Sequence, residues 1–428
     1  MPNGQSSTHL FRPKLLTTFV EGYGIDKARK DVMAALTVAI VALPLSMAIA
    51  VASGVSPERG LYTAIVGGFL VSALGGSRFQ IGGPAGAFIV LVASTVARHG
   101  LDGLLLAVLL SGLMLVVLGA VRLGSLIRHI PHAVAVGFTA GIAIIIFASQ
   151  IHDLCGLHLA DKEPGPLLPK LAALGGAWAT LQPAALATGA AVAAIIVIVR
   201  RLRPTWPGML MAVVIASVAV VLLKLPIETI GMRFGEMPRG LPAPALPDVS
   251  LDRLWQLLPV SLSFTLLGGL ESLLSAKIAD GMTGRYHRSN MELVAQGIAN
   301  VASALFGGIS VTGTIARTAT NVRAGACSPV SGMLHSAFVL VFLIVAAPLA
   351  AYIPLAALAG LLTVVCWNMA EKAEFARLLR DWRSALVLLA TFGLTLLEDL
   401  TTGIIAGCVV AAVLAFVFRQ KVAEEGDR

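Results

Sequence analysis

Charged residues are scarce in this chain. Lysine, arginine, aspartate and glutamate make up 13% of its 428 residues, whereas soluble globular domains carry about 25%. Hydrophobic residues make up 57%, and the mean hydropathy is +0.88. This composition excludes an ordinary soluble domain and indicates a protein that crosses a lipid bilayer many times.

Cysteine is also rare, and the few cysteines show neither CxxC nor metal-ligand spacing. We interpret them as small buried hydrophobic residues. His129 and His132 flank the start of one apolar run without a third ligand at useful spacing, so we expect no metal site. The four cysteines are Cys155, Cys327, Cys366 and Cys408.

Signatures of enzymes and of nucleic-acid binding are missing as well. No Ser/His/Asp set, metal cluster or Walker loop stands out, so the sequence predicts neither an enzyme nor a bound cofactor. The net charge of +8 could indicate nucleic acid. The basic residues lie between apolar runs, however, and form no patch with interleaved aromatic residues. We therefore expect no nucleic-acid partner.

One stretch breaks the apolar pattern in the second half of the chain. Residues 307–325 lie between the apolar runs Leu293 to Phe306 and Pro329 to Ala347, yet they are rich in glycine and hydroxyl groups and include Arg317. Irregular backbone at membrane depth is tolerated only where protein or a water-filled cavity surrounds it. An ionisable group there is costly enough to indicate function. The pattern predicts a half-helix that begins near Thr314, after an extended glycine-rich lead-in.

A second stretch, in the first half, has the same character. Residues 80–95 begin with a glycine and proline break and continue as a short helical run, with Pro84 expected in the first helical turn. Paired interruptions in corresponding places indicate the central site of a transporter, where the amino ends of half-helices meet. Such ends favour an anion because their N–H groups are unsatisfied and the helix dipole is positive there.

The apolar runs predict fourteen membrane segments, two of them short, in two sets of seven. The first span is expected to begin with Asp31 as its helix cap. Because an odd-numbered unit enters the membrane the second time in the opposite direction, the two sets form an inverted repeat. The predicted parts are a cytoplasmic N-terminal segment (1–30), a first repeat (31–224), a linker (225–255), a second repeat (256–418) and a cytoplasmic tail (419–428).

The positions of the basic residues agree with this predicted membrane topology. Most lysines and arginines fall on the side that holds both termini, as the positive-inside rule requires of the cytoplasmic side. The first 30 residues are polar, and no signal-peptide cleavage pattern follows them. Both termini are therefore expected in the cytoplasm.

Five motifs of the apolar region are distinctive in combination. They are ALPLSMAIAVASGVSPERGLY (42–62), GGSRFQIGGP (75–84), VGFTAG (136–141) with Ser149-Gln150, ESLLSAK (271–277) and TGTIART (312–318). Together they resemble the sulfate permease (SulP) family of anion transporters, and the resemblance covers roughly residues 25 to 420. It implies an all-α polytopic membrane protein with fourteen transmembrane segments in a 7+7 inverted repeat, divided into core and gate domains, with two half-helix segments. The substrate would lie between the third and tenth segments.

Two features depart from the usual family pattern. Family members usually continue into a cytoplasmic STAS domain, whereas this chain ends shortly after its last apolar run. Many relatives carry glutamine after the proline of the first span and an aromatic residue after the Gly-Pro of the third. This chain has Leu45 and Ala85 at those positions. The smaller, less polar lining favours an anion bulkier than chloride.

The resemblance and the two broken stretches define a set of candidate substrate-binding residues. Arg317 would lie in the first turn of a half-helix, where a cation opposes the dipole unless an anion or a carboxylate compensates. A structural ion pair with an acidic partner is the alternative, and simple helix capping is the alternative for the threonines. The candidates are Leu45, Ile49, Gly83, Ala85, Gly86, Thr312, Gly313, Thr314, Ile315, Ala316 and Arg317.

Glu271 is the one evident acid within an apolar run. It must be paired, protonated or ion-binding, and we treat it as the candidate site of proton coupling. A structural salt bridge to Arg317 or Lys277 is the alternative, and sodium coupling would also use an acidic group. Gly137 and Gly141 form a GxxxG pattern, which is more often a helix-packing device than a functional site.

These observations predict a secondary transporter of a small anion in the bacterial cytoplasmic membrane. Sulfate, bicarbonate and a dicarboxylate such as fumarate are the candidate substrates, with proton symport as the driving mechanism because no nucleotide site is visible. An anion channel or an exchanger of the same fold stays open, and so does a homodimer. A nucleobase permease is disfavoured because that family places a carboxylate in the tenth segment, and residues 307–322 contain none.

Overall fold

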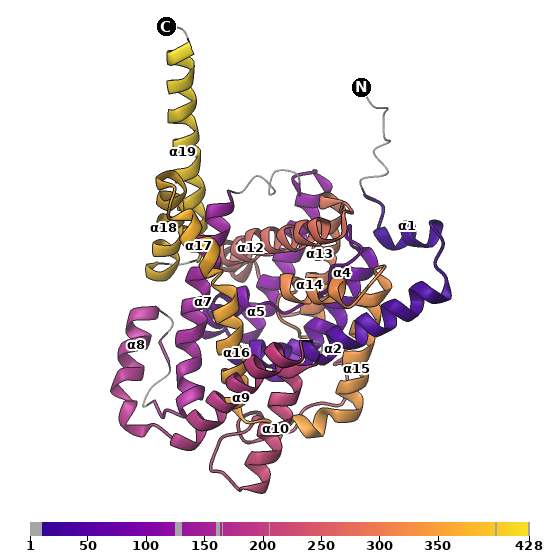
Figure 1. Cartoon of the computed structure of the whole chain (residues 1–428), viewed down its shortest axis with the longest axis vertical. Coiled ribbons are helices and arrows are strands. Elements are labelled where there is room, and N and C mark those ends of the chain that lie inside the picture. Colours follow the sequence, from indigo (N-terminus) through magenta and orange to yellow (C-terminus); the bar gives the residue numbers. More distant parts are fainter. Residues whose placement is uncertain are drawn as a thin grey trace.

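The computed structural model describes residues 11–124, 131–159, 163–164, 166–204, 206–398 and 400–426. This part of the chain is built almost wholly from helices (Figure 1). Seven of its helical segments are long and apolar enough to cross a membrane. They are α2 (Ile25–Ala52), Gly86–Ala120 with α5 (Ile89–Ala120), α7 (His132–Cys155), α9 (Pro183–Leu202), α12 (Leu251–Thr283), α15 (Val330–Ala350) and Leu355–Leu378 with α16 (Leu355–Met369).

Further helices complete this all-α membrane fold. Apolar examples are α8 (Leu167–Gly176), α10 (Gly208–Leu222), α18 (Trp382–Leu397) and α19 (Leu400–Gly426). The others are α1 (Lys14–Val20), α3 (Pro57–Tyr62), α4 (Gly68–Leu74), α11 (Ile230–Phe234), α13 (Ser289–Leu305), α14 (Ile315–Arg323) and α17 (Lys372–Leu378). The polytopic helical fold is therefore confirmed, whereas the count of fourteen segments stays a prediction.

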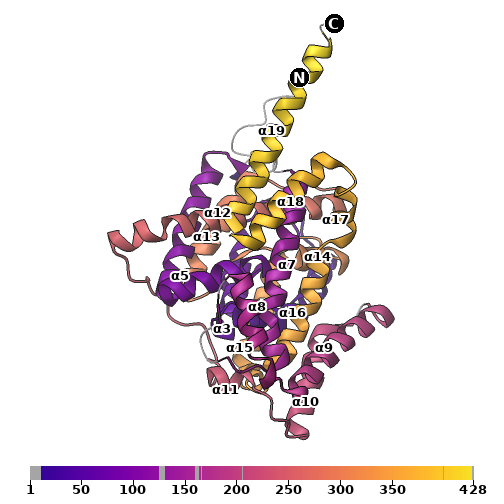
Figure 2. The same cartoon turned by 90° about the vertical axis from the view of Figure 1, so that its left-hand side faces the viewer.

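The helices pack in two groups (Figures 1 and 2). One group consists of α2 to α5 and α12 to α15, and the other of α7, α9, α10, α16, α18 and α19. The groups meet where α16 and α10 contact α2, and where α7 contacts the start of α5. This division corresponds to the core and gate domains expected from the resemblance.

Helix α2 begins at Ile25, so the prediction that Asp31 caps the first span is wrong. Asp31 lies fully buried inside the helix. Its carboxylate accepts hydrogen bonds from the backbone N–H groups of Cys327 (2.7 Å) and Ser328 (3.2 Å) and from the hydroxyl of Tyr23 (3.0 Å). The carboxylate thus accepts from backbone N–H groups of the turn between α14 and α15. No local sequence pattern indicates this contact, because Asp31 is far from that turn along the chain.

The break near residue 80 is followed by a short helical run, as predicted. A 3₁₀ turn (Gly86–Phe88) leads into α5, and the helix is interrupted at Gly100, where φ is 69°. Ala85 is the N-cap residue of the turn. Pro84 therefore precedes the helix, and its expected place in the first helical turn is wrong. The backbone before Pro84 stays extended because Gly82 and Gly83 pair with Gly313 and Thr312.

The predicted linker is partly helical. Helix α12 begins at Leu251, within the range 225–255, because the hydroxyl of Ser250 caps it by accepting from the backbone N–H of Arg253 (3.3 Å). Upstream, Ile230 donates to the carbonyl of Ile353 (2.9 Å), which ties α11 to the loop before α16. The termini of the predicted N-terminal segment and tail, residues 1–10 and 427–428, lie outside the described residues.

The GxxxG pattern of α7 packs two helices together. A Cβ atom at Gly137 would lie 2.6 Å from the carbonyl oxygen of Leu388, and one at Gly141 would lie 2.8 Å from a methyl carbon of Thr395. Both neighbours belong to α18. The glycines therefore let α7 and α18 approach closely, which confirms the packing interpretation.

Candidate anion site

Two short strands bring the broken stretches together. Strand β1 (Gly82–Gly83) pairs antiparallel with β2 (Thr312–Gly313), with Gly82 opposite Gly313 and Gly83 opposite Thr312. The 3₁₀ turn that leads into α5 follows β1, and α14 follows β2. The amino ends of both half-helices therefore start at one strand crossing, where their free N–H groups and dipoles make the potential positive.

The crossing requires glycine at two positions. A Cβ atom at Gly83 would lie 1.6 Å from Nη1 of Arg317, and one at Gly313 would lie 1.4 Å from Nε2 of Gln80. Real Cβ atoms never approach other atoms so closely. The bare glycine backbone therefore makes room for two polar side chains against the strands.

Polar side chains satisfy the irregular backbone before β2. Asn300 donates to the carbonyl of Val311 (2.8 Å) and accepts from its N–H (3.0 Å), and Gln296 also donates to that carbonyl. The N–H of Ile309 donates to the hydroxyl of Thr63 (2.8 Å). These bonds replace those that a helix would make within itself, so the extended segment can lie at membrane depth.

Helix α14 begins where the sequence predicts, with Thr314 as its N-cap residue. It is held in place by two side chains that reach the β1 lead-in. The hydroxyl of Thr318 accepts from the N–H of Ile81 (3.2 Å), and the amide of Asn321 donates to the carbonyl of Phe79 (2.9 Å). The two half-helices are thereby fixed relative to each other.

Arg317 is the charged group of this crossing. Its side chain lies in the first turn of α14 and is 2% exposed. Nη2 donates to the hydroxyl of Ser46 (3.0 Å) and to the carbonyl of Pro84 (3.3 Å), whereas Nε and Nη1 have no hydrogen-bond partner. No carboxylate lies within ion-pair distance of it in the described part of the chain. The alternative of a structural ion pair is therefore not seen among the described residues, and burial of an unpaired cation is costly unless an anion compensates.

Glu271 lies near this group without touching it. It is within electrostatic range of Arg317, but among the described residues it forms no ion pair with Arg317 or with Lys277, which is exposed. Its Oε2 atom is buried and has no hydrogen-bond partner. The salt-bridge alternative is not supported by this geometry.

The predicted apolar residues of the first and third segments are all buried. Leu45 and Ile49 are buried in α2. Ser46, whose hydroxyl accepts from Arg317, lies between them in the sequence. Ala85 is buried at the start of the 3₁₀ turn. Gly86 faces the other helix group, since a Cβ atom added there would lie 3.7 Å from Sδ of Met369 and 3.8 Å from Cδ1 of Ile146.

The predicted residues of the tenth segment differ in their surroundings. The hydroxyl of Thr312 donates to the carbonyl of Gly268 (3.2 Å). The hydroxyl of Thr314 is buried, has no partner and makes no capping hydrogen bond, so the capping interpretation fails for this side chain. Ile315 is half-buried at the first position of α14, and Ala316 is exposed.

The structure also shows polar groups that the sequence interpretation missed. His335 is fully buried in α15 within electrostatic range of Arg317, and neither ring nitrogen has a partner. Glu292 is fully buried, with Oε2 accepting from the N–H of Ser77 (2.8 Å) and Oε1 unpartnered. Glu292 is thus a buried acid that the sequence interpretation did not single out beside Glu271. An ionisable residue in an apolar run was the signal for His335.

The expectation about cysteines is met in part. Cys155 and Cys366 are buried, whereas Cys327 and Cys408 are partly exposed, and all four are free. Across the described ranges, no group of three His, Cys, Asp or Glu side chains could hold a metal ion. His132 contacts Glu374 (3.2 Å), and His129 lies outside the described residues.

Comparison with known proteins places the chain among transporters. The sulfate permease family profile matches residues 29–391. The putative sulfate transporter YvdB of Bacillus subtilis (strain 168) is 45% identical over 413 residues, covering 95% of this chain and 76% of the relative. The bicarbonate transporter BicA of Picosynechococcus sp. is 31% identical over 402 residues, covering 90% of this chain and 70% of the relative.

Solved structures agree with this assignment. The transmembrane domain of a cyanobacterium bicarbonate transporter BicA matches with a TM-score of 0.79 at 28% identity, covering 91% of this chain and 98% of that one. The structure of SLC26A9 has a TM-score of 0.85 at 19% identity, covering 94% and 68%, and shows likeness of fold alone. The chain therefore belongs to the sulfate permease family and is a multi-pass membrane protein.

Proposed function

We propose that this protein is a secondary active transporter that binds a small anion at the crossing of β1 and β2. The observation that carries the proposal is Arg317, a buried guanidinium with no carboxylate partner among the described residues, placed at the amino ends of two half-helices. An anion there would compensate the cation and both helix dipoles. The relatives named as sulfate and bicarbonate transporters support anion transport rather than enzymatic activity.

The substrate class follows from the lining of the crossing. Leu45, Ile49 and Ala85 are apolar and buried, whereas the unpartnered donors belong to Arg317 and Thr314. This combination favours an anion that one guanidinium and a few N–H groups can hold. Sulfate, bicarbonate and a dicarboxylate such as fumarate fit that chemistry, and we propose the substrate from among them.

We propose proton symport, with Glu271 as the proton-binding group. Protonation of a carboxylate near Arg317 removes a negative charge that would compete with the anion for the guanidinium. The buried and unpartnered Oε2 atom supports this role. Glu292 is a second candidate because its Oε1 atom is also buried without a partner. Sodium coupling is the alternative outcome.

The test is uptake by proteoliposomes that contain the purified protein. Labelled sulfate, bicarbonate, fumarate, aspartate and chloride are offered with an inward proton gradient on or off. We expect saturable uptake of one anion that the gradient stimulates. Flux without saturation would assign an anion channel, and obligatory counter-transport would assign an exchanger. Uptake of uracil in place of every anion would contradict the proposal.

Three variants assign the roles of the side chains. Arg317→Gln should lower uptake by about 30-fold or more, because it removes a buried charge that pairs with the anion. Glu271→Gln should abolish the effect of the gradient while saturable binding persists. Thr320→Ala is the matched control, since its hydroxyl bonds only within α14. If Glu271→Gln keeps the gradient dependence and Glu292→Gln loses it, the proton site is Glu292.

We further propose that the protein resides in the bacterial cytoplasmic membrane with both termini in the cytoplasm. The distribution of basic residues supports this orientation. A cysteine introduced by Lys30→Cys should react with an impermeant thiol reagent only after the cells are opened. Crosslinking in membranes tests whether a homodimer forms.

A further inference from the structure

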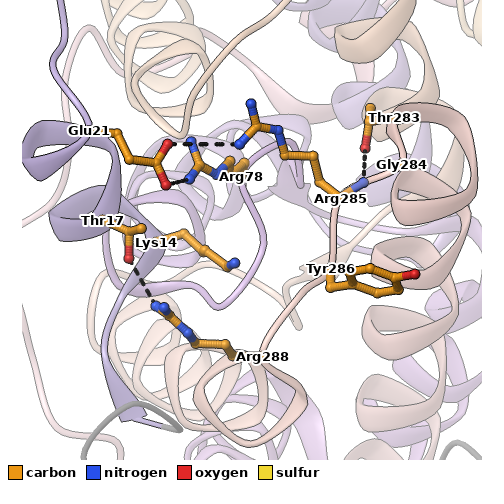
Figure 3. Close-up of a pocket in the computed structure, with 9 residues that line it drawn as sticks. All are labelled: Lys14, Thr17, Glu21, Arg78, Thr283, Gly284, Arg285, Tyr286 and Arg288. Atoms are coloured by element: carbon orange, nitrogen blue, oxygen red, sulfur yellow. Dashed lines mark hydrogen bonds and ion pairs between the residues drawn. The ribbon is translucent and has the colours of Figure 1, made fainter. Parts of the chain in front are cut away.

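A basic pocket of about 500 Å³ lies beside α1, away from the strand crossing. It is formed by α1, by the loop before β1 and by the turn between α12 and α13 (Figure 3). Four of its side chains are cations and one is a carboxylate. The lining residues are Lys14, Thr17, Glu21, Arg78, Thr283, Gly284, Arg285, Tyr286 and Arg288.

The three arginines are anchored around the pocket. Arg78 forms an ion pair with Glu21, and Nη1 of Arg285 lies 3.8 Å from the same carboxylate. Arg288 donates through Nη1 to the carbonyl of Arg12 (2.6 Å) and to the hydroxyl of Thr17 (3.0 Å). The Glu21 carboxylate thus interacts with two guanidinium groups, and the pocket keeps an excess of positive charge.

Two donors of the pocket have no partner. The ammonium group of Lys14 forms no hydrogen bond or ion pair with any described residue, and Figure 3 shows it directed between Arg78 and Arg288. The Nε atom of Arg78 is buried and unpartnered, on a side chain that is 7% exposed. A buried guanidinium N–H beside a free ammonium group indicates an anionic ligand with several acceptor oxygens.

The exposed apolar side chains of helix α1 indicate that this pocket faces a membrane surface. Leu16, Phe19 and Val20 are 50%, 54% and 73% exposed, whereas Thr18 on the opposite side is buried. A short helix with an exposed apolar face next to basic residues is typical of an element that lies in the headgroup region. Tyr286 at the rim is 83% exposed, as aromatic residues at a membrane interface are.

We propose that this pocket binds the phosphate group of an acidic phospholipid. Phosphate oxygens can accept from Lys14, from Arg78 and from Arg288 at once, while the acyl chains extend along the apolar face of α1. Bound lipid would join α1 to the helices of the first group. This inference does not depend on the transported substrate, because the pocket shares no residue with the strand crossing.

The experiment is lipid-dependent thermal unfolding of the purified full chain in detergent. Phosphatidylcholine, phosphatidylglycerol, cardiolipin and inorganic phosphate are titrated separately. We expect the two acidic lipids to raise the melting temperature of the wild type more than phosphatidylcholine does. Lys14→Gln should weaken the apparent affinity for acidic lipid by about fivefold, the effect of one basic residue near an anionic lipid surface. Lys30→Gln, an exposed lysine of α2 outside the pocket, should leave it unchanged.

Arg285→Gln is a second variant, chosen because the side chain is 55% exposed and its removal should not unfold the chain. It should weaken acidic-lipid binding in the same direction. Equal stabilisation by acidic and neutral lipid, or equal affinity in Lys14→Gln and the wild type, would overturn the proposal. Full stabilisation by inorganic phosphate alone would also overturn the lipid assignment, because the pocket would then serve a soluble phosphate.

Discussion

The guanidinium of Arg317 is accommodated by small neighbours and not by an opposing charge. Its Nη1 atom lies against the bare backbone of Gly83, and Nη2 donates to Ser46 and to the carbonyl of Pro84. A flat guanidinium can make these contacts and still present its other N–H groups, whereas the compact ammonium of lysine cannot. The residue type therefore matters at this position as much as the charge.

Lys14 gives a prediction at the residue scale. Burial and the nearby cations Arg288 and Arg78 disfavour its charged form, and they lower its pKa to about 8 despite the opposing carboxylates of Asp280 and Glu21. Its neutral amine should therefore appear as the pH rises through about 8, well below the ordinary lysine value of about 10.4. Amine acetylation followed by peptide mass spectrometry across pH 6 to 11 measures the midpoint.

Acidic lipid bound in the pocket favours the ammonium form, so it should move the midpoint of Lys14 upward. A midpoint of Lys14 at the ordinary lysine value without lipid would contradict the assigned environment. A midpoint for Lys14 that ignores acidic lipid would contradict the phosphate pocket.

At the scale of elements, the crossing of β1 and β2 joins two half-helices through a few backbone bonds. The N–H of Thr314 donates to the carbonyl of Ile81 (3.2 Å). Side chains from α13 and α14 supply the remaining bonds, so the crossing is held from several helices at once. The candidate site should therefore behave as a rigid unit, whose geometry depends on the absence of a side chain at Gly83 and at Gly313.

Gly83→Ala tests that dependence. The added Cβ would occupy the place of Nη1 of Arg317, and this side chain is too buried to move freely. We expect a loss of anion uptake together with a destabilisation of about 1–3 kcal/mol, the cost of overpacking. Gly313→Ala should displace Gln80 with a similar loss. Uptake assays and thermal unfolding measure both effects.

The control is Gly175→Ala in α8, where nothing lies within 4 Å of the added atom. It should retain uptake and stability. Wild-type uptake in Gly83→Ala would mean that the guanidinium can leave its place without cost, and the proposed role of Arg317 would then fail.

Much of the crossing of β1 and β2 could be predicted from the sequence, because the residues that mark its breaks and its helix start are local signals. Glycine and proline mark both breaks, and Thr314 marks the start of α14. The contacts of Asp31 and the burial of Glu292 could not be predicted, since they depend on partners that folding brings from distant positions.

At the scale of the whole molecule, the candidate site lies next to the contacts between the two helix groups. Gly86, at the start of the 3₁₀ turn, belongs to the first group. A Cβ at Gly86 would lie 3.7 Å from Sδ of Met369 in α16 and 3.8 Å from Cδ1 of Ile146 in α7. Those distances are ordinary van der Waals contacts, so the gap between the groups admits a methyl group and little more.

Movement of one group against the other should therefore be sensitive to bulk at Gly86. Gly86→Ala should keep uptake close to that of the wild type, because a methyl group fits the gap. Gly86→Phe should abolish uptake while the protein still folds, since the ring would wedge α7 and α16 away from the start of α5. Uptake by proteoliposomes, with thermal unfolding as the check of folding, distinguishes the two. Rapid uptake in Gly86→Phe would mean that the groups do not close over this position during transport, and the anion would have to leave the crossing by a path that avoids the boundary between them.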